Sequence, residues 1–173
     1  MVKELENTIK STVLLSDDEQ YRYRLTRVWD ENKPRATVIM LNPSKADMLT
    51  TDRTIMNVTN YLVSNNYGSF TVVNLFAYRT TDPKYLTHRD NEQELLNNSY
   101  LAESFVESDT IIVAWVRDKD RFVMRKREVE DTLAAYREKV KCFEDGKGRK
   151  LRHPRDLGLD WKLVDYEFMY INK

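Results

Sequence analysis

Three short polar segments follow apolar runs in this chain, and their residue types suit the binding of a small polar ligand. The first is Asn42-Pro43-Ser44, which comes directly after the apolar run 38–41. The Asn42 amide offers one acceptor and two donors, so it is able to fix a water molecule or a polar ligand. Pro43 would hold the turn rigid. The alternative is that Asn42 only ends a strand before proline, a common turn arrangement.

The second segment begins at Asn74, which interrupts the otherwise apolar run 72–76. A buried amide without hydrogen bonds costs about 1–3 kcal/mol. Asn74 therefore either bonds neighbouring backbone as a structural residue or points into a pocket, where it would bind the amide edge of a ligand. Arg79 follows and is able to clamp an anion such as phosphate. Its alternative is a surface ion pair with Asp82 or Asp90.

The third segment is 115–119, after the apolar run 110–115. We expect Trp115 to contact the ligand, together with Phe76 from the second segment. Two carboxylates, Asp47 and Asp52, lie between the first two segments and could position a water molecule as a general base. The commoner role of such residues is to cap a helix, and we expect Asp52 to be an N-cap.

A basic segment, 146–155, carries five cations and no acid. From residue 117 to 155 there are 14 Lys or Arg against 8 Asp or Glu, a net charge of +6 in a chain whose overall net charge is zero. This asymmetry favours a face that binds phosphates, although a solvated loop is the alternative. His153 lies in this segment, where its neighbours favour the neutral imidazole, a possible donor to an oxyanion. It could equally be a lone surface histidine. The expected contacts to a nucleic-acid backbone are Lys147, Arg149, Lys150, Arg152 and Arg155.

Several kinds of chemistry are not supported by the composition. A single cysteine, Cys142, excludes a disulfide scaffold, and two histidines make a zinc site improbable. The sequence contains no Walker loop and no Gly-x-Ser-x-Gly elbow. We therefore expect neither a metal nor an organic cofactor.

The elements that must position these residues alternate along the chain. Strands are predicted at 21–29, 37–41, 70–76, 110–115 and 140–143, with an edge strand within 161–171; helices are predicted after Asp52 and at 91–107 and 121–138. This alternation predicts a mostly parallel sheet between helices. In such sheets ligands bind outside the carboxyl ends of the strands, which is where the three polar segments lie.

The length and composition suit one domain. The chain has 173 residues, 41% of them hydrophobic. We expect a single domain over 1–173, with an N-terminal extension at 1–20 and a basic loop at 144–160. No run approaches the roughly 20 apolar residues that a membrane-spanning helix needs. A cytoplasmic protein without membrane contact is expected, and its oligomeric state stays open.

Several of these segments, taken together, resemble one protein family. The stretches Met40 to Asp47, Tyr67-Gly68, Val72 to Pro83, Ala114-Trp115 and Arg152-His153-Pro154 resemble the family called domain of unknown function 1643. The resemblance covers the chain from about Tyr21 to about Leu163. The name of the family records that no activity is established.

The chain has a more distant likeness to the uracil-DNA glycosylase superfamily. In that superfamily an Asn-Pro or Asp-Pro positions the attacking water, a later asparagine binds the pyrimidine edge, and a histidine in a late His-Pro-Ser loop stabilises the departing base. Asn42-Pro43, Asn74 and His153-Pro154 resemble these motifs in the same order, with Arg155 in place of the serine. The likeness implies a three-layer α/β/α sandwich with a short, mostly parallel central sheet, and it implies Asn42 and His153 as catalytic residues.

Three hypotheses for the function follow. The first is a glycosylase-type enzyme that binds a flipped base, with Asn42 holding the water, Asn74 binding the base and His153 stabilising the leaving group. Candidates for stacking on the base are Tyr67, Phe76 and Tyr78. The second is a nucleic-acid or nucleotide binding module without catalysis. The third is a protein-interaction or regulatory protein.

Overall fold

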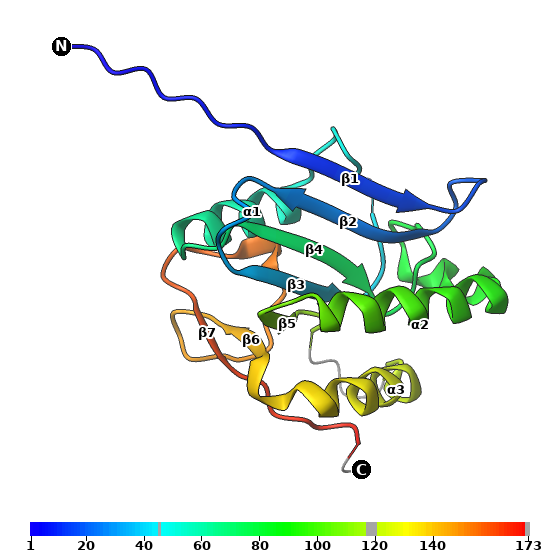
Figure 1. The fold of residues 1–173 in the computed structure, drawn as a ribbon. Coiled ribbons are helices and arrows are strands. Elements are labelled where there is room, and N and C mark those ends of the chain that lie inside the picture. Colours follow the sequence, from blue (N-terminus) through cyan, green and yellow to red (C-terminus); the bar gives the residue numbers. More distant parts are fainter. Residues whose placement is uncertain (45, 117–120, 172–173) are drawn as a thin grey trace.

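A seven-stranded sheet forms the centre of the molecule (Figure 1). The computed structural model describes residues 1–44, 46–116 and 121–171. In space the strands follow the order β1-β2-β4-β3-β5-β6-β7. Their bounds are β1 (Lys10–Leu15), β2 (Arg22–Val28), β3 (Arg35–Met40), β4 (Ser69–Asn74), β5 (Thr110–Val113), β6 (Val140–Glu144) and β7 (Lys162–Asp165).

The sheet is mixed, with parallel strands at its centre. β4, β3, β5 and β6 run parallel, whereas β1, β2 and β7 each pair antiparallel with a neighbour. All residues of β4 and all but the first of β3 are buried, as expected for strands covered on both faces. The predicted α/β class is confirmed, and the antiparallel strands at both edges reduce the parallel part to four strands.

Helices cover both faces of the sheet (Figure 1). The α-helices are α1 (Arg53–Ser64), α2 (Asn91–Val106) and α3 (Val123–Leu133), and the 3₁₀ helices are η1 (Pro83–His88), η2 (Ala134–Lys139) and η3 (Pro154–Asp156). Residues of α1 share one apolar cluster with Val38 and Val72, whereas residues of α2 and α3 share another with Ile39 and Val73. Within the described residues, no helix has the length and apolar character that crossing a membrane requires.

Strand β1 lies within the segment that we expected to be an N-terminal extension. Its residues alternate between exposed and half-buried, and none is fully buried. β1 pairs only with β2, so it is an edge strand that needs no continuous apolar face. The sequence therefore carries little signal for it.

The end of α1 and the helix predicted at 121–138 both differ in detail from expectation. We expected Gly68 to supply a left-handed cap, but Asn66 takes the positive φ of 64° after α1. Gly68 instead permits close packing, because a Cβ there would lie 1.8 Å from the Asp30 carbonyl oxygen. The helix predicted at 121–138 is α-helical only to Leu133 and continues as η2.

A buried carboxylate fastens the segment 166–171 to α3. Glu130 is 0% exposed. Its two oxygens accept hydrogen bonds from the Tyr166 hydroxyl at 2.5 Å and from the backbone N–H groups of residues 169, 170 and 171 at 2.7–3.0 Å. Burial and the Glu130 carboxylate raise the pKa of Tyr166 well above its usual range. Glu130 is thus a structural acid with a full set of donors.

Candidate functional site

Three loops meet at the carboxyl ends of β3 and β4. β2 begins at this edge because it runs antiparallel to β4. The Arg79 N–H donates to the Gln20 carbonyl at 2.9 Å, and the Thr80 N–H donates to the Pro43 carbonyl at 3.1 Å. These bonds join the loop before β2 to the loops after β3 and β4. The first two predicted polar segments therefore lie side by side.

Asn42 joins two of these loops through its side chain. Its Nδ2 donates to the Thr80 carbonyl at 2.6 Å and to the Pro43 carbonyl at 3.2 Å. This is the structural role that we weighed for Asn42. The amide oxygen has no hydrogen-bond partner among the described residues, so it remains an acceptor for a water molecule.

Asn74 is the last residue of β4 and is 1% exposed. Neither its Oδ1 nor its Nδ2 has a hydrogen-bond partner among the described residues. Side chains alternate between faces along a strand, and Val73 belongs to the cluster of α2 and α3, so Asn74 faces α1. One of the two alternatives for Asn74 was a structural role in which its side chain bonds neighbouring backbone. The structure shows no such hydrogen bonds among the described residues.

Arg22 begins β2 at the same edge and is 2% exposed. One guanidinium nitrogen donates to the Ala46 carbonyl, while Nε has no partner among the described residues. Burial and the neighbouring Arg79 lower the pKa of Arg22 to about 10, although Asp52 and Asp47 act in the opposite direction. A buried cation without an ion pair is costly, so this position is unusual.

Asp52 is the N-cap of α1, as predicted. Its Oδ1 accepts the Ile55 N–H at 2.8 Å, and its Oδ2 accepts the Ser44 hydroxyl at 2.6 Å. Ser44 is thereby oriented by α1. The charge of Asp52 also acts on Arg22 and on His153, which places all three in one electrostatic neighbourhood.

His153 lies beside α1, at the N-cap of η3. Its Nδ1 accepts the Arg155 N–H at 3.1 Å, so the proton of the neutral ring is on Nε2. Burial first, and Arg155 second, lower the pKa of His153 below its usual value. The predicted neutral imidazole is therefore supported, with burial as the larger cause, and its Nε2–H is available as a donor.

A hollow of about 360 Å³ opens at this edge. Arg79 lies in its wall, half-buried, and donates one guanidinium hydrogen bond to the Glu19 carbonyl at 3.1 Å. Tyr78 also lines it, packed against Tyr21 with ring centroids 5.4 Å apart. The lining residues are Glu19, Gln20, Ser44, Tyr78, Arg79, Thr80 and Thr81.

Three other predicted residues lie elsewhere. Phe76 and Trp115 are each 2% exposed and belong to the apolar cluster on the opposite face, beneath α2 and α3. Tyr67 bonds Thr110 at the amino end of β5, so it cannot stack on a ligand at the carboxyl edge. Of the three aromatic candidates, only Tyr78 lines the hollow. Residues 117–119 of the third polar segment lie outside the described residues.

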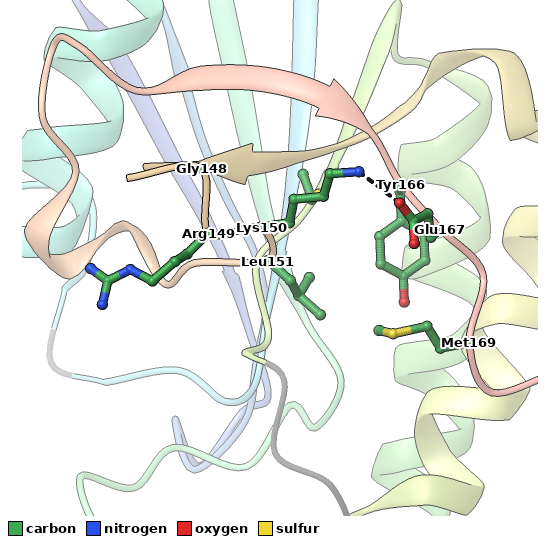
Figure 2. A pocket seen from close by; sticks show the side chains of 8 residues that line it. Gly148, Arg149, Lys150, Leu151, Tyr166, Glu167 and Met169 are labelled. Carbon is green, nitrogen blue, oxygen red and sulfur yellow. Dashed lines mark hydrogen bonds and ion pairs between the residues drawn. The ribbon is translucent and has the colours of Figure 1, made fainter. Parts of the chain in front are cut away.

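The basic loop binds acids of its own chain. Arg149 and Arg152 form ion pairs with Asp145 at 2.7 and 3.3 Å, and Lys150 pairs with Glu167 at 2.6 Å. Figure 2 shows Lys150 turned toward Glu167 over a pocket of about 460 Å³, with Arg149 pointing away from it. Lys147 and Arg155 are exposed and form no ion pair with a described residue. Of the five cations predicted to contact a nucleic-acid backbone, only Lys147 and Arg155 therefore remain unpaired among the described residues.

Sequence reasoning missed the arginines of β2. The alternation within 21–29 predicts a strand with one face in solvent, with Arg22 on that face and Arg27 on the apolar face; both arginines are buried, at 2% and 7% exposed. Arg27 donates to the Thr51 hydroxyl at 2.6 Å, and its Nε also lacks a partner among the described residues. The sequence pattern gave no sign that these two arginines are buried. For a metal, the described part of the chain offers no group of three or more His, Cys, Asp or Glu.

Comparison with known proteins gives one result. A family model described as "Protein of unknown function (DUF1643)" matches residues 22–155. No curated protein and no solved structure matches the chain. The match runs from the start of β2 into η3 and includes Arg22, Asn42, Asn74, Arg79 and His153, whereas Glu19 and Gln20 of the hollow lie before it.

Proposed function

Since the chain belongs to DUF1643, a family of proteins of unknown function, we propose its function from the site: it binds a nucleobase or nucleotide at the carboxyl ends of β3 and β4. One observation carries this proposal. Asn74 is a buried amide whose donor and acceptor both lack partners among the described residues, and such a group loses about 1–3 kcal/mol unless a ligand or water satisfies it. The edge of a pyrimidine offers a matching acceptor and donor.

The surroundings of Asn74 support a base as the ligand. Tyr78 lines the hollow at the same edge of the sheet and would give a ring on which a base stacks. Asn74 is 1% exposed, so a ligand reaches its amide only after a local opening. Binding is then expected to be slower than for a preformed pocket.

Hydrolysis of an N-glycosidic bond is the reaction that we propose for this site. Water would add to C1′ of the sugar while the bond from C1′ to the base nitrogen breaks and its electron pair leaves with the base. The Asn42 amide oxygen would accept a hydrogen bond from that water, and the His153 Nε2–H would donate to the base oxygen that gains charge. The proton of the water passes to solvent or to the released base.

The wider architecture agrees with this proposal. Helices on both faces of the sheet are what a glycosylase-like three-layer arrangement requires. Lys147 and Arg155 would contact the phosphates of a nucleic-acid strand. A cytoplasmic location, expected from the lone cysteine, stays a prediction. The alternative function is a binding module on the same site, favoured by the engagement of Asn42 with backbone carbonyls.

Binding and release should be measured together. Titration calorimetry with the common nucleosides tests binding, and oligonucleotides that carry uracil, mismatched or modified pyrimidines test base release. We expect Asn74→Leu to abolish both, whereas Asn98→Leu, an exposed asparagine on α2, should change neither. The double variant Asn42→Ala, His153→Ala should bind without releasing the base. Binding without release by the wild type would leave the binding module, and the absence of both would overturn the proposal.

A further inference from the structure

Arg22 is the buried cation that the proposed function has not used. It is 2% exposed and forms no ion pair with a described residue within 4 Å. Ionised groups are almost never buried without a counter-charge, because desolvation costs several kcal/mol per ion. The charges of Asp47 and Asp52 reach Arg22, but both carboxylates already accept hydrogen bonds, from backbone N–H groups and, for Asp52, also from Ser44. Among the described residues the guanidinium thus has one hydrogen-bond acceptor, the Ala46 carbonyl, and no ion-pair partner.

A second guanidinium, that of Arg79, lies at the same edge, because the Arg22 N–H donates to the Ala77 carbonyl and the Arg79 N–H donates to the Gln20 carbonyl, each at 2.9 Å. The repulsion between Arg79 and Arg22 is part of the reason why the Arg22 pKa lies below its usual value. The Arg79 guanidinium donates one hydrogen bond, to the Glu19 carbonyl, and its other N–H groups have no partner among the described residues. Two like charges at one edge are stabilised by an anion placed between them.

The hollow beside Arg79 has room for such an anion. Its volume of about 360 Å³ falls in the lower part of the range found for small-molecule sites. Thr81 lines the same wall, so a further hydroxyl group is at hand. Ser44 also lines it, with its hydroxyl hydrogen donated to Asp52. Guanidinium groups present forked N–H donors that match the oxygens of a phosphate.

We propose that Arg22 and Arg79 form a phosphate subsite next to the base-binding Asn74, so that the ligand is a nucleotide and not a free base or nucleoside. This inference rests on the proposed function, because Asn74 supplies the base contact. The phosphate is that of a free nucleoside monophosphate or a phosphodiester within a strand. Its binding relieves the repulsion between the two arginines and gives Arg22 its missing counter-charge.

The test compares each nucleoside with its 5′-monophosphate by titration calorimetry in a buffer without phosphate. The wild type should bind the monophosphate roughly 10- to 100-fold more tightly, which corresponds to hydrogen bonds with a charged group. Arg79→Gln and Arg22→Gln should each remove most of this preference and leave nucleoside affinity unchanged. Arg137→Gln removes an exposed charge at the opposite edge of the sheet and should retain the preference. Dinucleotides with one internal phosphodiester then distinguish a strand from a free nucleotide.

The outcomes separate this inference from the proposed function. Nucleoside binding without any gain from the phosphate overturns the phosphate subsite and leaves the base site standing. Loss of both nucleoside and monophosphate binding in Asn74→Leu, with the preference intact in the wild type, supports both. If the wild type binds neither molecule, both fail. If Arg22→Gln does not fold, Arg79→Gln decides. Competition by inorganic phosphate is the second test: it should displace the monophosphate but not the nucleoside.

Discussion

Two buried charged groups in this molecule have opposite surroundings. Glu130, on α3, is 0% exposed and accepts four hydrogen bonds from the segment 166–171. Arg22, on β2, is 2% exposed, donates to one carbonyl and keeps an unpartnered Nε. Both groups give up hydration on folding; among the described residues Glu130 recovers four hydrogen bonds, whereas the Arg22 side chain recovers one.

The difference separates structure from function. A buried polar group with a full set of partners stabilises the fold, and its removal leaves those partners unsatisfied. A buried polar group that lacks some or all of its partners lowers the stability of the protein without ligand. Such groups are found at functional sites more often than elsewhere. Arg22 and Asn74 belong to the second kind and lie at one edge of the sheet.

The largest effect on stability is expected from Glu130→Ala. It removes the acceptor of four buried donors, so the free energy of unfolding should fall by about 3–5 kcal/mol. Urea denaturation measures this. Glu138→Ala, an exposed acid on η2, should stay within about 0.5 kcal/mol of the wild type. A loss below about 1 kcal/mol for Glu130→Ala would show that its four hydrogen bonds do not stabilise the fold, contrary to the contrast drawn with Arg22.

Two buried asparagines sharpen the contrast within one residue type. The Asn97 amide donates to the Asn74 carbonyl at 3.1 Å and has a longer contact with the Leu75 carbonyl. Asn97→Leu should therefore cost about 1–3 kcal/mol. Asn74→Leu, measured without ligand, should leave stability unchanged or raise it, because its polar atoms have no partners among the described residues to lose. Equal losses in both variants would contradict a ligand role for Asn74.

A smaller effect is expected from Asp52→Ala, which removes the N-cap of α1 and the bond from Ser44. The loss should be about 1 kcal/mol, typical of an N-cap. Asp52→Asn keeps a capping oxygen and should recover most of the loss. Circular dichroism during thermal unfolding follows both variants, and a neutral Asp52→Ala would show that α1 begins independently of this cap.

The smallest effect concerns pH. The pKa of His153 is lower in the folded protein than its ordinary value of 6.5, so the unfolded chain binds a proton more readily. Stability from this group is present above pH 6.5 and is lost as the pH falls through and below that value. The midpoint of urea unfolding should decline over this range in the wild type, and less steeply in His153→Gln. Parallel profiles for the two proteins would exclude His153 as the source.

The central part of the fold could be predicted because its signals are local. Continuous apolar runs marked β3, β4 and β5, and Asp52 marked the start of α1. β1 could not be found, since an edge strand with no buried residue needs no distinctive pattern. The antiparallel placement of β2 beside β4 depends on long-range pairing, which periodicity does not encode.

The candidate site could be predicted only in part for the same reason. Asn42, Ser44, Asn74 and Arg79 end adjacent parallel strands, so topology brings them to one edge. Phe76 and Trp115 lie two residues beyond the ends of β4 and β5 and pack beneath α2 and α3. For Phe76 the loop after β4 breaks the alternation that would have kept it on the face of Asn74. Arg22 was missed because an arginine in an alternating strand is typical of a solvated face, and its hydrogen bond to the Ala46 carbonyl joins residues 24 apart in the chain.

The hydrogen bonds of Glu130 have a consequence for the order of folding. The donors lie 36 to 41 residues after Glu130 in the chain, and β6 and β7 lie between them. A loop of this length must close before the carboxylate receives any of its donors, and closure costs entropy before it is rewarded. We therefore expect the Glu130 carboxylate to gain these donors late in folding, when the segment 166–171 closes over α3.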